Sequence, residues 1–458
     1  MKYNKLMIAS FTAAAIIFSA TVVSCGSSST DEVVDTEGST VMSQENNYLP
    51  PSPGVGNTGS DGISKDQGQF WSSNYDLVTE EGSVVNITNT TFGVNETTGH
   101  IKGYPSDGDN PMAKHVRAVS GSTYGTAYTY TAVSNDSFNN QSIEATAENS
   151  LIDNGDGTIT DTSTGLMWMK DDAPNTMEWK DALSYAENLD YAGYTDWKLP
   201  DVKELQSIVD YTGVYPTLDE SYFNITDFEE TNPNYYFWTS TSAYFGGNNT
   251  DYGYAWYVAF GFSVGDETDT HEAGAVRFSP KYVGSPFEGE GGDNITNSVR
   301  ACRIDERYYA DAPSKVITTG QSQSYDNDGN VIYPQEGDEY YGQDAVYETV
   351  PFSFTDNGDG TVTDNNTGLV WQQQPSDDHL SIDSTLEYAD SLELGGIDDW
   401  RVPTLEELYS IQDYSEGWPY ADLTYFYFPT AASVPNVQVA LRAVVLKVAV
   451  HREIKQIF

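Results

Sequence analysis

A block of sequence occurs twice in this chain of 458 residues, in one register and without a gap. Residues 153–161 read DNGDGTITD, and residues 356–364 read DNGDGTVTD. The register then continues through paired apolar and aromatic residues: Trp168/Trp371, Leu183/Leu386, Trp197/Trp400, Pro200/Pro403, Leu205/Leu408 and Tyr211/Tyr414. A repeat of this kind defines the folding unit, so we expect the unit to carry the function.

Turn, helix and strand signals follow one another within the unit. The DNGDG segment joins short extended runs at 151–152 and 158–160, and Asn-Gly and Asp-Gly are strong hairpin signals. Apolar residues at helical spacing predict a helix over about 177–190. Asp201 begins a second helix, and Thr404 begins a capping box at the matching position of the second copy. Four strand-like stretches come next, at 235–241, 255–262, 275–278 and 298–303. This order predicts an α+β unit.

The chain resembles the bacterial Lcl C-terminal domain family through the strings DNGDGTITDTSTGLMW, GYTDWKLPDVKELQSIVDY, FWTSTS, AWYVAF and NSVRA. The resemblance covers 151–303 completely and 353–428 in part. It implies a C-type-lectin-like α+β fold, a surface location, glycan binding as in the adhesin that gives the family its name, and no established enzyme activity. Members commonly carry a cysteine in the first helix and another after Val-Arg. Because Ala186 and Ala301 stand at these places, we expect the family's disulfide to be absent.

Two partial copies flank the complete unit, which we assign to 151–304. The strings FWSS and VRA in the segment 66–125 resemble FWTS and VRA in the complete unit, so this segment resembles its back half. The segment 353–428 resembles its front half. Either the two halves complete one domain and close the chain on itself, or both ends have decayed independently.

The beginning of the chain has the pattern of a lipoprotein signal peptide, assigned to 1–24. Lys2 and Lys5 precede an apolar run, and small residues precede Cys25, whose thiol would carry the lipid. Gly26 at the next position favours the outer membrane or cell surface. Residues 25–65 are rich in Ser, Gly, Asp and Pro, and predict a flexible tether.

Two further segments lie outside the repeats. Residues 305–352 are expected to link the two copies. The tail, 429–458, contains no Gly, Asp, Tyr or Trp and is basic. That change of composition suggests a translated frameshift, with a genuine basic helix or strand as the alternative.

The charge of the chain limits its partners. There are 69 acidic and 21 basic residues, which give a net charge of −48. This field opposes nucleic acid, anionic lipid and sulfated polysaccharide, because their binding draws on Lys and Arg. A neutral or calcium-bridged glycan is more consistent with it. Only two cysteines are present, so once Cys25 is lipidated Cys302 has no partner within the chain.

Two loops of the complete unit carry the candidate site residues. Aromatic rings can pack on sugar C–H surfaces while Asn and Asp take hydroxyls. The candidate ligand-binding residues are Tyr244, Phe245, Asn248, Asn249, Asp251, Tyr252 and Tyr254. A second, acidic set could hold calcium, or could be a solvated loop: Asp266, Glu267, Asp269 and Glu272. The DNGDG turns do not fit the EF-hand register and are interpreted as hairpins.

Enzyme motifs are weak in this sequence. The string GFSVG at 261–265 matches a hydrolase nucleophile elbow, and Asp266, Glu267 and His271 follow it, but no amphipathic helix begins there. No HExxH, CxxC or P-loop string occurs. We therefore expect a lipid-anchored envelope protein that binds a glycan or another cell-surface ligand without catalysis. A structural envelope protein, able to form homo-oligomers, is the alternative, and a hydrolase using Ser263 is the remote one.

Overall fold

The computed structural model describes most of the chain from residue 65 to residue 429. The described residues are 65–75, 78–80, 83–85, 90–105, 112–122, 124–130, 147–211, 216–226, 235–244, 252–261, 273–285, 295–347, 349–415, 417 and 419–429. The predicted signal peptide, Cys25, the tether before residue 65 and the tail beyond Pro429 lie outside them. Within the described residues, no helix is long and apolar enough to cross a bilayer.

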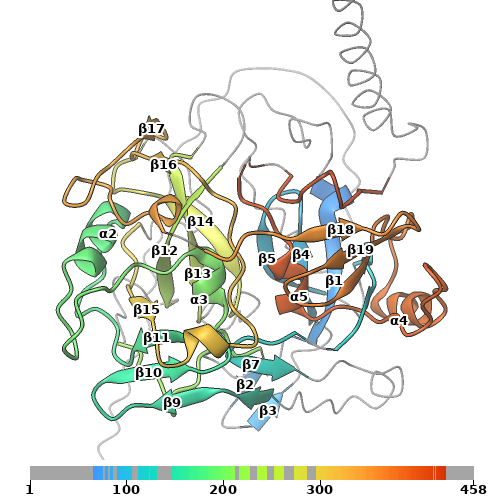
Figure 1. Ribbon diagram of the computed structural model, residues 1–458, viewed down its shortest axis with the longest axis horizontal. Helices are drawn as coiled ribbons and strands as arrows, with labels where there is room; N and C mark the ends of the chain where they lie inside the picture. Colours follow the sequence, from blue (N-terminus) through green and yellow to red (C-terminus); the bar gives the residue numbers. More distant parts are fainter. Residues whose placement is uncertain are drawn as a thin grey trace, which may run out of the picture. The chain divides into compact units, whose positions relative to one another are not determined.

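The first three strands of the complete unit and its last strand form a four-stranded antiparallel sheet (Figure 1). Its strands are β9 (Leu151–Asp153), β10 (Thr158–Asp161), β11 (Leu166–Met169) and β15 (Cys302–Ile304), in the order β15-β11-β10-β9. The DNGDG hairpin forms where it was predicted, because Asn154 N donates to Thr158 O at 3.0 Å. Strand β15 closes the sheet by pairing Cys302 with Trp168.

Two helices follow the first three strands in each copy of the repeat. They are α2 (Trp179–Glu187) and α3 (Val202–Gln206) in the complete unit, and α4 (Ile382–Asp390) and α5 (Leu405–Ser410) in the second copy. Helix α2 buries the predicted apolar face, which includes Leu183 and Ala186. Asp201 caps α3, and Thr404 caps α5, each in a capping box with the glutamate three residues later. Both predicted helix starts are confirmed.

The first half-unit and the complete unit share one six-stranded sheet. Its strands are β1 (Gln69–Tyr75), β4 (Thr90–Asn95), β5 (His100–Pro105), β12 (Tyr236–Ala243), β13 (Tyr254–Ala259) and β14 (Val276–Pro280). The order is β1-β4-β5-β14-β13-β12. The two halves of this sheet meet where Ile101 of β5 pairs antiparallel with Val276 of β14.

The two half-units complete one domain. A second four-stranded sheet has the order β18-β19-β20-β6, with β18 (Phe354–Asp356), β19 (Thr361–Asp364) and β20 (Val370–Gln372) from one end of the chain and β6 (Val119–Ser120) from the other. Figure 1 shows the blue strands β1, β4 and β5 beside the orange and red elements of residues 353–429. Val116 and Ala118 pack with Leu386, Trp400 and Val402 in one buried cluster. Of the two explanations that the sequence left open, the structure supports closure of the chain on itself.

The segment expected to be a plain linker, 305–352, folds against the complete unit. It contains the hairpin β16 (Ser324–Tyr325) and β17 (Val331–Ile332) and the short 3-10 helices η2 (Tyr309–Asp311) and η3 (Asp344–Val346). Gln343 is fully buried, and Asp344 is buried beside it. Another 3-10 helix and two further hairpins complete the fold: η1 (Lys65–Gly68), β2 (Val78–Glu80) with β3 (Ser83–Val85), and β7 (Tyr128–Tyr130) with β8 (Ala147–Asn149).

The fold class is mixed α+β, as predicted. The described residues form four α-helices and mostly antiparallel sheets. The sequence anticipated the helices within a few residues at each end, and the strands at 236–243 and 254–259 lie close to their predicted positions. It missed the role of 305–352, whose polar residues gave no signal of burial.

Arg117 provides a test of chain closure. Its guanidinium is fully buried, pairs with Glu96 at 2.9 Å, and donates to the carbonyl oxygens of Gln372, Gln373 and Tyr427. Replacing it with Met leaves the Glu96 carboxylate buried and unpaired. We expect Arg117→Met to lower the free energy of unfolding by about 3–5 kcal/mol in urea titration.

The control for this test is Lys180→Met. The Lys180 side chain is 34% exposed and pairs with Glu339, whose side chain is 76% exposed, so its loss should cost about 1 kcal/mol or less. Equal effects of the two substitutions would show that Arg117 does not hold the two ends of the chain together.

Candidate functional site

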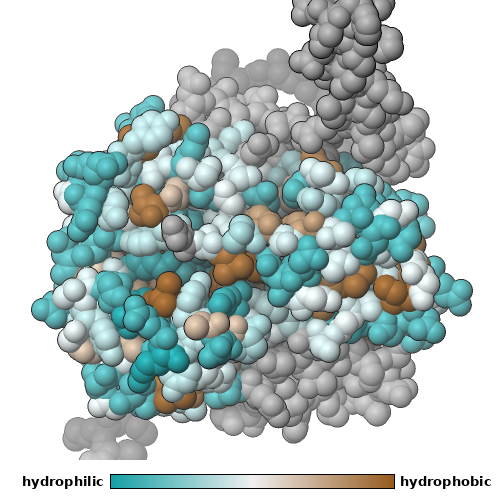
Figure 2. Space-filling view, viewed as in Figure 1, coloured by the Kyte–Doolittle hydropathy of each residue, from teal (hydrophilic) through white to brown (hydrophobic). Residues whose placement is uncertain are grey.

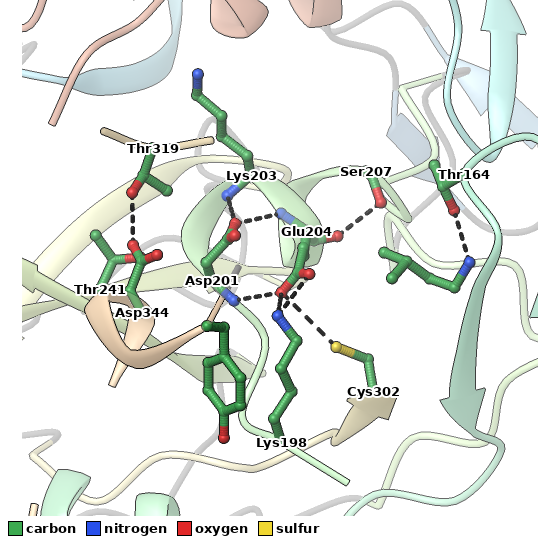
Figure 3. A network of polar contacts seen from close by, with 12 residues as sticks. Thr164, Lys198, Asp201, Lys203, Glu204, Ser207, Thr241, Cys302, Thr319 and Asp344 are labelled. Carbon is green, nitrogen blue, oxygen red and sulfur yellow. Dashed lines mark hydrogen bonds and ion pairs between the residues drawn. The ribbon is translucent and has the colours of Figure 1, made fainter. Parts of the chain in front are cut away.

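A polar cluster surrounds the start of α3 (Figure 3). Pro200 ends the preceding extended run and Asp201 caps the helix, which brings Lys198 back over the first turn. Lys198 Nζ lies 2.7 Å from both carboxylate oxygens of Glu204. Glu204 Oε2 also accepts the backbone N–H of Asp201 at 2.9 Å and lies 3.8 Å from the thiol of Cys302. This carboxylate is therefore held from several sides.

Burial and mutual charge set the protonation of the cluster. Burial alone would lower the pKa of Lys198, but its acidic neighbours together, with Glu204 the strongest among them, outweigh burial and raise the pKa above its usual value. Burial raises the pKa of Asp201 well above its usual value, and Glu204 and Asp344 add to the effect. Burial also raises the pKa of the Cys302 thiol. The cluster therefore keeps a charged ammonium and a protonated thiol at neutral pH.

Asp344 joins the cluster from the segment after the complete unit. Its Oδ2 accepts the hydroxyls of Thr241 at 2.8 Å and Thr319 at 2.6 Å. Burial raises the pKa of Asp344 to about 6, against the hydrogen bonds from the two threonines, which lower it. The neighbouring Gln343 donates to the carbonyl oxygen of Tyr325 at 3.0 Å. These bonds fix the segment against β12.

Lys203 leaves the cluster in the opposite direction. Figure 3 shows its side chain pointing away from Lys198 and Glu204. Its ammonium donates to the carbonyl oxygens of Thr318 at 3.0 Å and Ser410 at 2.9 Å. Burial lowers the pKa of Lys203 to about 7. Because Ser410 belongs to α5, this lysine ties the two units together rather than serving a site.

A cavity of about 230 Å³ lies beside the cluster. Its lining combines carboxylates, cations, hydroxyls and apolar groups from Thr164, Leu166, Asp196, Lys198, Asp201, Glu204, Arg303, Ile304, Tyr309, Val316, Tyr347 and Thr349. The last four come from the segment 305–352, and the others come from the complete unit. At the wall, Arg303 makes a bidentate pair with Asp196, with N···O distances of 2.7 and 2.9 Å. This cavity is the strongest candidate site in the described part of the chain.

Where the structure describes them, the tyrosines predicted to stack on a sugar pack against other aromatic rings. Tyr252 lies parallel to Tyr325, with ring centroids 4.0 Å apart, and meets Tyr244 edge-on at 5.4 Å. Tyr254 is only 4% exposed and packs edge-on against Phe278. The sequence-based hypothesis that Tyr254 offers an exposed ring to a sugar is therefore wrong, because its position in β13 directs its ring into the core.

The other predicted site residues lie outside the described residues. They are Phe245, Asn248, Asn249 and Asp251 of the ligand set and Asp266, Glu267, Asp269 and Glu272 of the acidic set. Ser263 and His271 of the hydrolase motif also lie outside them. Among the described residues, no three His, Cys, Asp or Glu side chains form a group that could hold a metal ion.

The carboxylates of the first DNGDG turn are used within the turn. Asp153 Oδ1 accepts the N–H of Gly155 at 2.9 Å, and Asp156 Oδ1 accepts the N–H and hydroxyl of Thr158. Lys170 pairs with the other oxygen of Asp153 at 2.6 Å. These bonds support the hairpin interpretation of the motif.

The cavity residues were not singled out from the sequence. The string KLPDVKE places four carboxyl or ammonium groups among apolar residues, and that density of charge at a helix start was the available signal. The four are Lys198, Asp201, Lys203 and Glu204. The residues that close the cavity from 305–352, among them Tyr309 and Tyr347, had no local signal, because only the tertiary fold brings them there.

One family model matches the chain. The Lcl C-terminal domain matches residues 157–278 and 360–442. The second match continues past Pro429 into the atypical tail, whose structure lies outside the described residues. No curated protein and no solved structure matches the chain.

Asp344 predicts a pH dependence of stability. The pKa of its carboxyl is about 6 in the native protein, against an ordinary value of 3.8, so the native protein holds this proton more tightly than the unfolded chain. The free energy of unfolding should therefore fall as the pH rises from about 4 to about 6. Asp344→Asn cannot ionise, and we expect it to remove up to about 3 kcal/mol of this fall, measured by urea unfolding.

Glu339→Gln is the control for this experiment, because the Glu339 side chain is 76% exposed. It should leave the pH profile of the wild type unchanged. A parallel shift of the whole Asp344→Asn curve, with the slope retained, would assign the pH dependence to other groups.

Proposed function

Because the chain carries two members of the Lcl C-terminal domain family, we propose that it is a non-catalytic, lipid-anchored protein of the bacterial cell envelope that binds a glycan. Its repeat units are C-type-lectin-like in this proposal, which the two helices and short antiparallel strands of each unit support. The cavity beside α3 is the observation that carries the proposal.

The lining of the cavity suits a polyhydroxylated ring. Apolar groups of Leu166, Ile304 and Val316 can contact C–H surfaces, and the rings of Tyr309 and Tyr347 add aromatic surface. The carboxylates and threonine hydroxyls of the same cavity offer hydrogen bonds to sugar hydroxyls. This mixture of apolar and polar groups is typical of a site that binds a small polar ligand.

The protonation state of the cavity supports binding rather than catalysis. Lys198 carries a raised pKa and is held by Glu204, so it is a poor general base at neutral pH. Burial keeps Cys302 in its thiol form, and the thiolate is the nucleophilic form of cysteine. A hydrolase would have to use Ser263, and loss of an esterase activity in Ser263→Ala would be needed to support that alternative.

The surface of the protein supports the proposed location outside the cytoplasm. On the face shown in Figure 2, apolar residues form small separate patches on a largely hydrophilic surface. The net charge of −48 favours a solvated protein and opposes anionic partners. A neutral glycan, or one bridged by calcium, fits these properties, and nucleic acid does not.

A structural role in the envelope is the second candidate. It is favoured by the six-stranded sheet, which joins both units into one body that could serve as a spacer or self-associate. A spacer needs no small ligand, so ligand binding separates the two functions.

The lipid anchor can be tested by labelling cells with a palmitate analogue. We expect the wild type to carry the label and to remain with the membrane fraction. Cys25→Ala should lose both the label and membrane association, because its thiol is the predicted acylation site. Cys302→Ala is the matched control and should keep both. An unlabelled wild type that is recovered in the soluble fraction would contradict the anchor.

A glycan array tests the binding function. The full chain should bind neutral glycans, and the array should be read with calcium and with a chelator to identify a bridging ion. Heparin should not bind at low salt, since the acidic field opposes sulfate groups. Absence of binding to every glycan, together with concentration-dependent self-association in ultracentrifugation, would favour the structural role instead.

A further inference from the structure

The volume of the cavity limits the size of its ligand. At about 230 Å³ it is smaller than the pockets of about 300–1,000 Å³ that hold drug-sized molecules. We propose that this cavity holds one terminal sugar ring of a glycan, and that the ring is uncharged or carries an amine. The inference rests on the proposed glycan binding and narrows it to a class of sugar and to one end of the glycan chain.

The charges of the lining exclude acidic sugars. Its two cations are each neutralised by a bidentate carboxylate: Lys198 by Glu204 at 2.7 Å, and Arg303 by Asp196 at 2.7 and 2.9 Å. Asp201 is a third acidic group of the lining, so the balance is never positive, whether Asp201 is ionised or protonated. A uronic or sulfated ring would enter this cavity without an unpaired cation to receive it, and it would lose its hydration.

Asp196 is the group best placed to accept bonds from the ligand. Its side chain is 62% exposed, whereas the Glu204 side chain is 8% exposed and already bonded to Lys198 and to the N–H of Asp201. A carboxylate oxygen that takes one bond from Arg303 keeps a further lone pair. Asp196 can therefore receive a sugar hydroxyl or ammonium without breaking its pair with Arg303.

The small volume also favours a chain end. An internal sugar of a polysaccharide is bonded to a sugar on each side, so both neighbouring sugars must lie outside the cavity when it is bound. A terminal sugar carries only one. Because the volume falls below the range for larger ligands, the next sugar of the glycan must lie outside the cavity.

The second unit supplies a matched control position. Asp399 occupies the place of Asp196 in the repeat, but it accepts a hydroxyl from Ser120 at 2.6 Å instead of an arginine. Asp399→Asn therefore removes the same charge without freeing a guanidinium. Asp196→Asn removes the same charge and leaves the guanidinium of Arg303 without its carboxylate partner.

The experiment uses saturation-transfer NMR on the full chain with methyl glycosides of a neutral hexose, an amino hexose and a uronic acid. We expect the wild type to bind a neutral or amino hexoside and to leave the uronide unbound. Thr349→Trp should fill the cavity and weaken this binding by about tenfold or more. Asp196→Asn should weaken it too and should gain binding of the uronide, since Arg303 is then unneutralised. Asp399→Asn should behave as the wild type.

The outcomes separate this inference from the glycan function itself. A wild type that binds the uronide best, or glycan binding that both Thr349→Trp and Asp196→Asn leave unchanged, would overturn the cavity assignment while the glycan function stands. If no glycan on the array binds, both the glycan function and the cavity assignment are overturned. Thermal unfolding of each variant shows that it is folded, and Asp196→Asn, at an exposed side chain, retains the test if Thr349→Trp does not fold.

Discussion

The antiparallel pair of Ile101 and Val276 is the joint on which the rest of the structure depends. Both side chains are fully buried. On one side the sheet continues as β5, β4 and β1, and on the other as β14, β13 and β12, so equivalent strands follow in the same order outward. An antiparallel pair with this mirrored order has the symmetry of an isologous interface. The two units are therefore arranged as a dimer within one chain, related by a pseudo-twofold axis through this pair.

The same contacts recur in the two units although their chains are connected differently. Trp238 Nε1 donates to Met177 O at 2.9 Å, and Trp71 Nε1 donates to Leu380 O at 2.9 Å. Arg300, like Arg117, donates to three carbonyl oxygens, and these belong to Met169, Lys170 and Asn224, the repeat positions of Gln372, Gln373 and Tyr427. The bonds are local in space, so they form whether the partner segments are joined through the unit or through the whole chain. Because these bonds do not depend on how the segments are connected, a unit whose halves lie at opposite ends of the chain still folds.

How much of this could be predicted depended on whether the signal was local. The helix start at Asp201, the capping box at Thr404 and the DNGDG hairpin need only a few neighbouring residues, and all three form as predicted. The closure was anticipated as one of two explanations because the repeat register shows which half each end lacks. Burial of Tyr254 and of Asp344 depends on contacts with distant segments, and no pattern in the adjacent sequence reports those contacts. The cavity was missed for the same reason, since its walls come from separate parts of the chain.

The pseudo-symmetry also allows the surroundings of equivalent carboxylates in the two units to be compared. Glu204 lines it, and the repeat position in the second unit is Glu407, which is paired with Arg401 in the same way. In the second unit, however, the backbone N–H of Tyr124 donates to Glu407 at 3.0 Å, and the Glu407 side chain is fully buried. The chain that leaves β6 thus covers the second carboxylate directly. In the complete unit, Tyr309 and Tyr347 of the segment 305–352 line the cavity beside Glu204. The two units of one fold therefore differ at this position, because the cavity lies beside Glu204, whereas the segment that contains Tyr124 is bonded directly to Glu407.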